Sequence, residues 1–187
     1  AAQAGAKTGA LPFTDVSAVY YAADAIRWAW ENGYFSGVSA VQFAPEQGLS
    51  RAMLVTVLWR MAGEPNAGVS TFADVLPGGW YEKAVAWANT RGLVSGTGAG
   101  SFSPDAPITR EQLIAILWRY AGSPQPAGSL SAFADGAQTS AYAQTAMAWA
   151  VETGLIGGSN GRLLPASGAT RAQTALILQR FAAWMGM

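Results

Sequence analysis

The sequence predicts an all-α fold built from three tandem repeats, and three observations support this prediction. An unusual helix start occurs three times, with an arginine directly after a hydroxyl residue and directly before an apolar run. These arginines are 59 and 61 residues apart. An earlier helical segment precedes each start and ends at a glycine suited to a helix C-terminus. The helix starts are Ser50-Arg51, Thr109-Arg110 and Thr170-Arg171, and the glycines are Gly33, Gly92 and Gly154.

Each repeat therefore contributes two helices joined by a long loop. The first helices are expected at about 20–32, 80–91 and 142–153, and the second at 50–62, 109–121 and 170–185. We divide the chain into an Ala/Gly-rich linker or tail (1–12) and repeats at 13–68, 69–128 and 129–187. A single pair of helices cannot bury its own apolar faces. We therefore expect one cooperative domain in which the three second helices are mutually close and mostly buried.

The second helices begin with recognisable caps. Thr109 with Gln112, and Thr170 with Gln173, form the S/T-x-x-E/Q capping box, whereas Ser50 is followed by Met53, which cannot complete it. The arginine in each first turn is unexpected, because the positive end of the helix dipole favours acids over bases there. Three copies of an unfavourable choice indicate a role beyond helix stability.

Composition excludes several classes of function. The 187 residues are 51% hydrophobic and only 12% charged, with no net charge, no cysteine and no histidine. The chain therefore lacks thiol and imidazole nucleophiles, bases and metal ligands, and we expect no catalytic residue, cofactor or metal. Without a basic patch or a run of about 18 apolar residues, we also expect no nucleic-acid partner and no membrane span. No signal-peptide pattern is present at the N-terminus, although a mature chain would have lost one.

The order of motifs resembles a known family. The second repeat shows it best, with Phe72-Ala73-Asp74-Val75, then Gly92-Leu93-Val94-Ser95-Gly96, Phe102-Ser103-Pro104-Asp105 and Ile108-Thr109-Arg110-Glu111-Gln112. This pattern is similar to the S-layer homology module of bacterial surface proteins, and it covers about residues 13–184. The resemblance implies a pseudo-threefold, three-pronged domain around a central bundle of three helices. It also implies grooves that bind an anionic secondary cell-wall polysaccharide, often bearing pyruvate ketals, at the extracellular surface of the cell wall.

The resemblance assigns the binding role to the arginines of the three helix starts. A helix N-terminus offers free backbone N–H groups and partial positive charge, and a guanidinium adds a bidentate donor for a carboxylate. We therefore expect Ser50-Arg51, Thr109-Arg110 and Thr170-Arg171 to form three acid-recognising corners. The alternative for each arginine is surface solvation or an ion pair with a neighbouring repeat. Arg60, Arg119 and Arg180 recur nine residues later, half a turn out of phase, and are interpreted as structural or solvated.

Three further sets recur in register. Tyr21, Trp80 and Tyr142 precede the capping glycines by twelve residues and are the best aromatic candidates for packing on a sugar ring. Trp28, Trp87, Trp149, Trp59 and Trp118 are instead expected in the core. Asp15, Asp74 and Asp135 either bind sugar hydroxyls or brace the opening turn of each repeat. Gly37, Gly96 and Gly158 permit special backbone angles or a close approach of ligand.

These observations favour a noncovalent wall anchor that catalyses nothing and is monomeric as an isolated module. Two alternatives stay open: a glycosidase that uses two carboxylates, and a helical-repeat scaffold that binds protein. We expect unequal grooves, with the strongest involving the second repeat, which combines Thr109, Arg110 and Gln112 with Trp80.

Overall fold

The computed structural model describes residues 10–187, so most of the predicted linker (1–12) lies outside the described residues. Within that range every regular element is helical, and the extended backbone forms isolated bridges only. The all-α prediction is therefore confirmed. The elements are α1 (Ala23–Glu31), α2 (Arg51–Met61), α3 (Glu82–Thr90), α4 (Arg110–Tyr120), the short 3₁₀ helices η1 (Gly136–Gln138) and η2 (Ala141–Ala143), α5 (Gln144–Glu152) and α6 (Arg171–Met185).

Helix boundaries follow the predicted caps closely. Ser50, Thr109 and Thr170 are the N-caps of α2, α4 and α6, and each side-chain oxygen accepts a backbone N–H three residues on. The reciprocal bond of the capping box is present in α4 and α6 but not in α2, as predicted. The first helices start two to three residues later than predicted, because turns precede them, as at Ala22 (φ −112°, ψ 12°). Gly33, Gly92 and Gly154 adopt left-handed φ values of 74°, 67° and 73° after the helices end.

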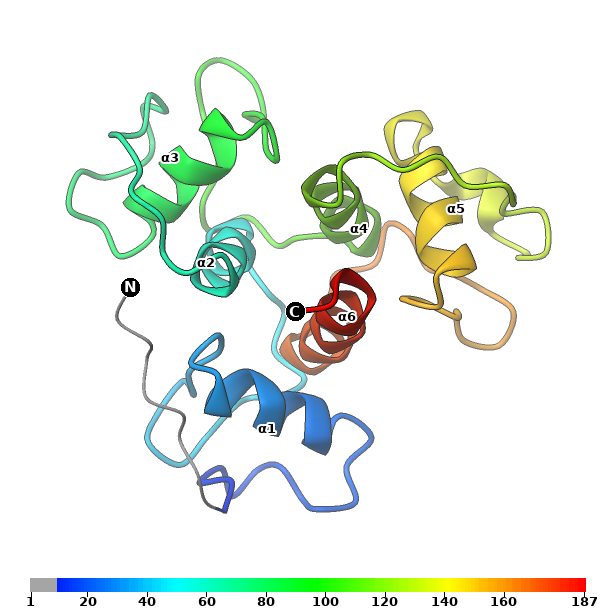
Figure 1. Cartoon of the computed structure of the whole chain (residues 1–187), viewed down its shortest axis with the longest axis horizontal. Helices are drawn as coiled ribbons and strands as arrows, with labels where there is room; N and C mark the ends of the chain where they lie inside the picture. Colours follow the sequence, from blue (N-terminus) through cyan, green and yellow to red (C-terminus); the bar gives the residue numbers. More distant parts are fainter. Residues whose placement is uncertain (1–9) are drawn as a thin grey trace.

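The helices are arranged as three lobes around a common centre (Figure 1). The second helices of the repeats, α2, α4 and α6, surround the centre, and α1, α3 and α5 lie outside them. Each outer helix packs against the second helix of the preceding repeat: α3 on α2, α5 on α4 and α1 on α6. A lobe therefore combines two repeats, and the packing of α1 on α6 joins the first repeat to the third.

A ring of three backbone hydrogen bonds ties the starts of the central helices together. Leu49 N–H donates to the carbonyl of Ala169 (2.9 Å), Ala169 N–H to that of Ile108 (3.0 Å), and Ile108 N–H to that of Leu49 (2.9 Å). All three side chains are buried. The ring brings the N-terminal ends of the three central helices together, whereas the extensive packing of each described central helix is against an outer helix. Since its members are about 60 residues apart in the chain, it also holds the repeats in one closed arrangement.

The N-termini of these helices are not free, which corrects the expectation of three backbone anion sites. Arg51 N–H donates to the carbonyl of Ala106 (3.0 Å) and Ala52 N–H to that of Pro104 (2.9 Å). In the same way, loop carbonyls of the third repeat accept the first two N–H groups of α4, and loop carbonyls of the first repeat accept those of α6. The cap hydroxyl takes the third N–H of each helix. These groups therefore join one repeat to the next, and the arginine side chains are left to recognise any anion.

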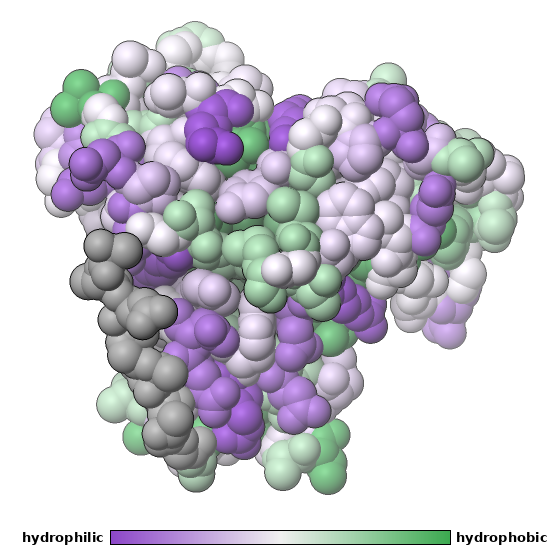
Figure 2. Space-filling view, viewed as in Figure 1, coloured by the Kyte–Doolittle hydropathy of each residue, from purple (hydrophilic) through white to green (hydrophobic). Residues whose placement is uncertain are grey.

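The surface matches the low charge of the sequence. The space-filling view shows three lobes on which small hydrophilic and hydrophobic areas are interspersed (Figure 2). Apolar residues gather at the centre of this face, where α6 ends. Among residues 10–187, no helix has both the length and the apolar character needed to cross a membrane.

Candidate functional site

The arginine that follows the N-cap of α2 is buried and fully oriented by backbone groups. Arg51 is 9% exposed, and its Nε donates to the carbonyl of Phe102 (2.9 Å) while Nη2 donates to that of Ser95 (3.2 Å). The guanidinium also lies 4.7 Å from the centre of the Phe102 ring. An arginine of the first repeat thus forms hydrogen bonds with a loop of the second. The alternatives of a solvated arginine and of an inter-repeat ion pair do not describe these contacts.

The arginines of the other two central helices repeat this arrangement. Arg171, 5% exposed, donates Nε to the carbonyl of Phe43 (2.8 Å) and Nη2 to that of Ser36 (2.7 Å). Arg110 is partly buried and donates Nε to the carbonyl of Leu163 (2.9 Å). Burial lowers the pKa of Arg171 to about 10, an effect that nearby Asp15 opposes, so the guanidinium is charged at neutral pH. Each motif arginine therefore combines a structural contact with a cationic group held beside the next repeat.

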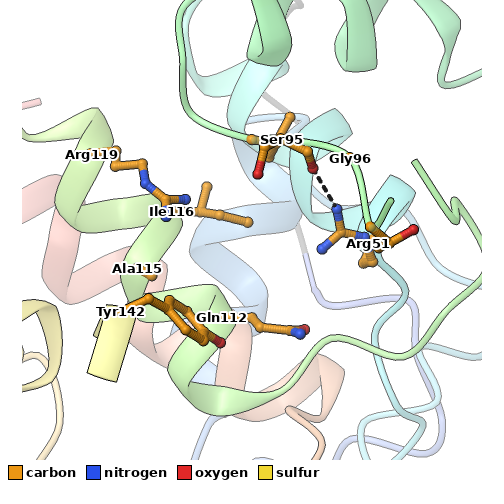
Figure 3. A pocket seen from close by; sticks show the side chains of 10 residues that line it. Arg51, Ser95, Gly96, Gln112, Ala115, Ile116, Arg119 and Tyr142 are labelled. Carbon is orange, nitrogen blue, oxygen red and sulfur yellow. Dashed lines mark hydrogen bonds between the residues drawn. The ribbon is translucent and has the colours of Figure 1, made fainter. Parts of the chain in front are cut away.

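A cavity of about 450 Å³ opens beside Arg51, a size typical of ligand pockets. Figure 3 shows how three repeats supply its walls: Arg51 comes from the first, the loop at Ser95 and Gly96 from the second, and Tyr142 from the third. Helix α4 completes the wall with four side chains, Gln112, Ala115, Ile116 and Arg119. The cavity, which we call the Arg51 groove, thus offers guanidinium groups, one amide, one phenol and an apolar floor.

The threefold relation assigns the remaining site candidates to two equivalent grooves. Arg110 lies within electrostatic range of Tyr21 of the first repeat, as Arg51 does of Tyr142. In the same register, Trp80 precedes α3, which packs on α2, and so belongs with Arg171. Arg110 and Trp80 therefore belong to different grooves. The sequence alone did not show which neighbours these two residues of the second repeat have. The ranking of the grooves, with the strongest involving the second repeat, stays a prediction.

The aromatic candidates are exposed as sugar contacts require, since Tyr21, Trp80 and Tyr142 are 57%, 58% and 50% exposed. The tryptophans expected in the core divide into two groups. Trp87 and Trp149 are buried. Trp28, Trp59 and Trp118 are partly buried and pack against the core, the last two donating their indole N–H to the carbonyls of Pro65 and Pro124.

The recurring aspartates act as clamps within each repeat. Both carboxylate oxygens of Asp74 accept backbone N–H groups, from Phe102 (2.7 Å) and Ser103 (2.8 Å). Asp15 binds Phe43 and Ala44, and Asp135 binds Leu163 and Leu164, in the same way. The hydrogen bond from Phe102, assisted by that from Ser103, lowers the pKa of Asp74. The structure supports the bracing interpretation, although the partner is the loop on which the arginine rests and not the opening turn.

The three loop glycines are required by packing within their own repeat. A Cβ at Gly96 would lie 2.6 Å from the carbonyl oxygen of Ser101 and 3.0 Å from the Phe72 ring. Gly37 and Gly158 have the same neighbours in their repeats, and only Gly158 has a left-handed φ, of 73°. A close approach of a ligand to these glycines was one expectation from the sequence. In the structure, the turn and a phenylalanine of the same repeat lie there. Gly96 still lines the Arg51 groove.

Several groove residues were missed or assigned elsewhere by the sequence analysis, above all Arg119. Arg119 was expected to point away from the motif arginines, because it lies half a turn out of phase with Arg110 on the same helix. Its groove partner is Arg51 of the preceding repeat. Arg119 donates Nη1 to the carbonyl of Leu93 (3.0 Å), and Arg60 and Arg180 make the equivalent bonds to Tyr34 and Leu155. The threefold recurrence of these arginines was the signal that could have found them.

Comparison with known proteins identifies the family. The sequence model of the S-layer homology domain matches residues 12–52, 71–114 and 132–175, more than half of the chain. The chain belongs to the S-layer homology domain family. Each match ends inside a second helix and contains one clamp aspartate and one motif arginine.

The similarity to known proteins covers most of this chain but only a small part of each relative. The chain is 30% identical over 178 residues to an endoglucanase of Bacillus sp. (strain KSM-635), covering 92% of this chain and 19% of that enzyme. It is 30% identical over 164 residues to the surface-layer 125 kDa protein of Lysinibacillus sphaericus, covering 86% and 14%. A cellulosome-anchoring protein of Acetivibrio thermocellus is 26% identical over 118 residues, covering 60% and 26%. The S-layer homology chain thus matches about a quarter or less of each relative.

Proposed function

We propose that this chain attaches a bacterial surface protein noncovalently to the cell wall by binding an anionic wall polysaccharide in its inter-repeat grooves. The observation that carries the proposal is the Arg51 groove. It places charged donors from two repeats beside a half-exposed aromatic ring and apolar side chains. A sugar ring needs an apolar surface for its C–H face, and an acidic substituent needs a guanidinium.

Family membership supports the location of the chain at the bacterial cell surface. By name, one relative is a surface-layer protein and another is an anchoring protein, and both are similar to this chain in the region that carries the module. The acidic group that suits the groove best is a carboxylate, such as the pyruvate ketal of a sugar. Arg51 already donates Nε and Nη2 to the backbone, which leaves the other edge of the guanidinium for an anion.

Binding without catalysis is the form that the described residues favour. A glycosidase needs two free carboxyl groups on opposite sides of the scissile bond. The three recurrent aspartates each use both oxygens on backbone N–H groups, and none of them lines the Arg51 groove. The similarity to the endoglucanase involves 19% of that enzyme, and the same module occurs in proteins named for anchoring.

The decisive experiment is sedimentation of the purified chain with bacterial cell walls before and after acid removal of the secondary polysaccharide. We expect binding to native walls, loss of binding to stripped walls, and competition by the released soluble polymer. Equal binding to stripped walls would contradict the proposal and favour the protein-binding scaffold. Turnover of fluorogenic glycans would favour the enzyme.

A pair of triple variants separates groove binding from general surface adhesion. Replacing the three groove aromatics Tyr21, Trp80 and Tyr142 by alanine should abolish sedimentation with native walls. The matched control replaces Val19, Val69 and Leu76 by alanine, because these exposed apolar residues (93%, 80% and 66% exposed) do not line the Arg51 groove. Retained binding by the aromatic variant would contradict the assignment to the grooves.

A further inference from the structure

A buried carboxylate lies directly behind the Arg51 groove. Glu111, in the first turn of α4, is only 7% exposed. Its Oε2 accepts the backbone N–H of Ser140 (2.9 Å), and its Oε1 accepts the Ser140 hydroxyl (2.7 Å) and the Tyr142 hydroxyl (3.2 Å). Burying a carboxylate is costly unless hydrogen bonds compensate it, and three donors do so here. Glu111 thus connects a central helix to the aromatic residue of the groove.

This connection is peculiar to one of the three grooves. The positions equivalent to Glu111 in α2 and α6 are Ala52 and Ala172, both fully buried. An alanine side chain offers no hydrogen-bond acceptor, so neither Tyr21 nor Trp80 has such a partner at its equivalent helix start. The Arg51 groove therefore has a polar support that the threefold relation does not explain.

The direction of the hydrogen bond decides what Tyr142 offers to a ligand. A phenol has one hydrogen, and in Tyr142 this hydrogen is donated to Glu111, which leaves the oxygen as an acceptor. Burial and the Glu111 carboxylate raise the pKa of Tyr142 to about 12, so the phenol stays protonated at neutral pH. Figure 3 shows the Tyr142 ring extending toward Gln112, with Arg119 on the same side of the cavity and Arg51 on the other side. An acceptor thus lies among cationic and amide donors.

We propose that Glu111 is a positioning residue that fixes Tyr142 as a hydrogen-bond acceptor in the Arg51 groove, and that this groove selects an acidic sugar carrying a hydroxyl or amide N–H donor near its carboxylate. The carboxylate pairs with guanidinium groups, and the neighbouring donor meets the Tyr142 oxygen. This inference rests on the proposed function and adds to it the arrangement of polar groups that the ligand must present.

A double-mutant cycle tests the coupling between the two residues. Soluble polysaccharide fragments released from purified walls are titrated calorimetrically into wild type, Glu111→Gln, Tyr142→Phe and the double variant. We expect each single variant to bind about three- to tenfold more weakly, the range of one hydrogen bond, and the double variant to bind no more weakly than Tyr142→Phe. Losses that multiply in the double variant would overturn the proposal. The matched control is Glu64→Gln, an exposed glutamate in the turn after α2, which should leave affinity unchanged.

A spectroscopic measurement tests the contact without any ligand. Tyrosine labelled with ¹³C at Cζ reports ionisation of each phenol by NMR, and Tyr142→Phe assigns the Tyr142 signal. We expect the Tyr142 pKa to lie above the ordinary value of about 10 in wild type and to fall in Glu111→Gln. A Tyr142 pKa at the ordinary value in wild type would overturn the proposal, even if Glu111→Gln failed to fold.

The outcomes separate this inference from the function on which it rests. If wild type binds the fragments, Arg51→Lys weakens binding and Glu111→Gln does not, the anchor function stands and the role of Glu111 is wrong. If the wild-type chain neither sediments with the walls nor binds the fragments released from them, both the anchor function and the role of Glu111 are wrong.

Discussion

The Arg51 groove and the equivalent site at Arg171, where α2 and Trp80 take the places of α4 and Tyr142, share one framework and differ in the residues around it. In both, the arginine donates Nε and Nη2 to two carbonyls of the next repeat and lies over a buried phenylalanine, at 4.7 Å from Phe102 and 4.4 Å from Phe43. At the Arg51 groove the central helix contributes Gln112 to the lining and Glu111 behind Tyr142, whereas Ala52 and Met53 hold the same positions in α2. The aromatic residue is Tyr142 in one and Trp80 in the other.

This difference separates two roles within a single motif. The arginine Nε groups bind the backbone of another repeat and hold the repeats in their cyclic arrangement, whereas the aspartate clamps and the cap hydroxyls bind backbone within their own repeat. The groups that vary between grooves touch the cavity and determine which ligand fits. We therefore expect substitutions in the framework to change stability at every groove alike, and substitutions in the variable groups to change binding at one groove.

The largest effect is expected from the phenylalanines beneath the arginines. Phe102 and Phe43 are fully buried, so Phe102→Ala and Phe43→Ala should each lower the free energy of unfolding by about 3–5 kcal/mol. Urea denaturation followed by tryptophan fluorescence measures both. A loss below about 1 kcal/mol at one site and the full loss at the other would show that the two frameworks are not equivalent.

The motif arginines should come next. Arg51→Ala and Arg171→Ala each leave two loop carbonyls without their donor, and we expect each to lower the free energy of unfolding by about 2 kcal/mol. The control Lys83→Ala removes an exposed cation and should change stability by less than about 0.5 kcal/mol. If the arginine variants behaved like the control, the arginines would be surface residues and the framework interpretation would be wrong.

The clamps predict a smaller, pH-dependent effect. Hydrogen bonds from Phe102 and Ser103 hold the pKa of Asp74 below 3.8 in the folded state. A depressed carboxyl pKa contributes stability above the unfolded value that is lost as pH falls through the folded value. Wild type should therefore lose stability progressively below about pH 4, and Asp74→Asn should lose less over the same window. Parallel pH profiles for the two proteins, measured by thermal unfolding, would contradict the clamp.

The smallest effect on stability, with a clear effect on binding, is expected from the exposed aromatic residues. Trp80→Ala should change the free energy of unfolding by less than about 1 kcal/mol, because the side chain is half exposed. Tyr142→Ala should cost about 1 kcal/mol, because it also removes one of the three donors to buried Glu111. Each should weaken binding of wall fragments at its own groove by roughly five- to tenfold. Calorimetry that showed unchanged affinity in both variants would remove the aromatic residues from the site.

Much of the architecture could be predicted because it depends on local signals. The caps at Ser50, Thr109 and Thr170 fixed the starts of the central helices, and the missing half of the capping box at Met53 was read directly from residue type. The register of the repeats indicated which arginines, aromatic residues and glycines are equivalent. Such signals depend on residues only a few positions apart, so they can be recognised in the sequence.

The partners of these residues could not be predicted, because they lie in another repeat. Arg51 binds a loop about 50 residues later, and Arg171 binds one about 130 residues earlier, so sequence distance gave no indication of either contact. The same limitation left the groove partners of Arg110 and Trp80 open and directed Arg119 away from the site. The occupation of the helix N-termini by Pro45, Pro104 and Pro165 carbonyls was missed for this reason too, although the prolines recur in register.

The central claim is that wall polysaccharide binds in the inter-repeat grooves against the motif arginines. The most direct test is NMR of the chain labelled with ¹⁵N-arginine, titrated with soluble wall-polysaccharide fragments. The Nε–H of Arg51 is held by the Phe102 carbonyl and should give a distinct signal. We predict that the Nε–H signals of Arg51 and Arg119 shift together and saturate at the same ligand concentration. Shifts confined to arginines outside the grooves, such as exposed Arg162, or no shift at all, would contradict the account.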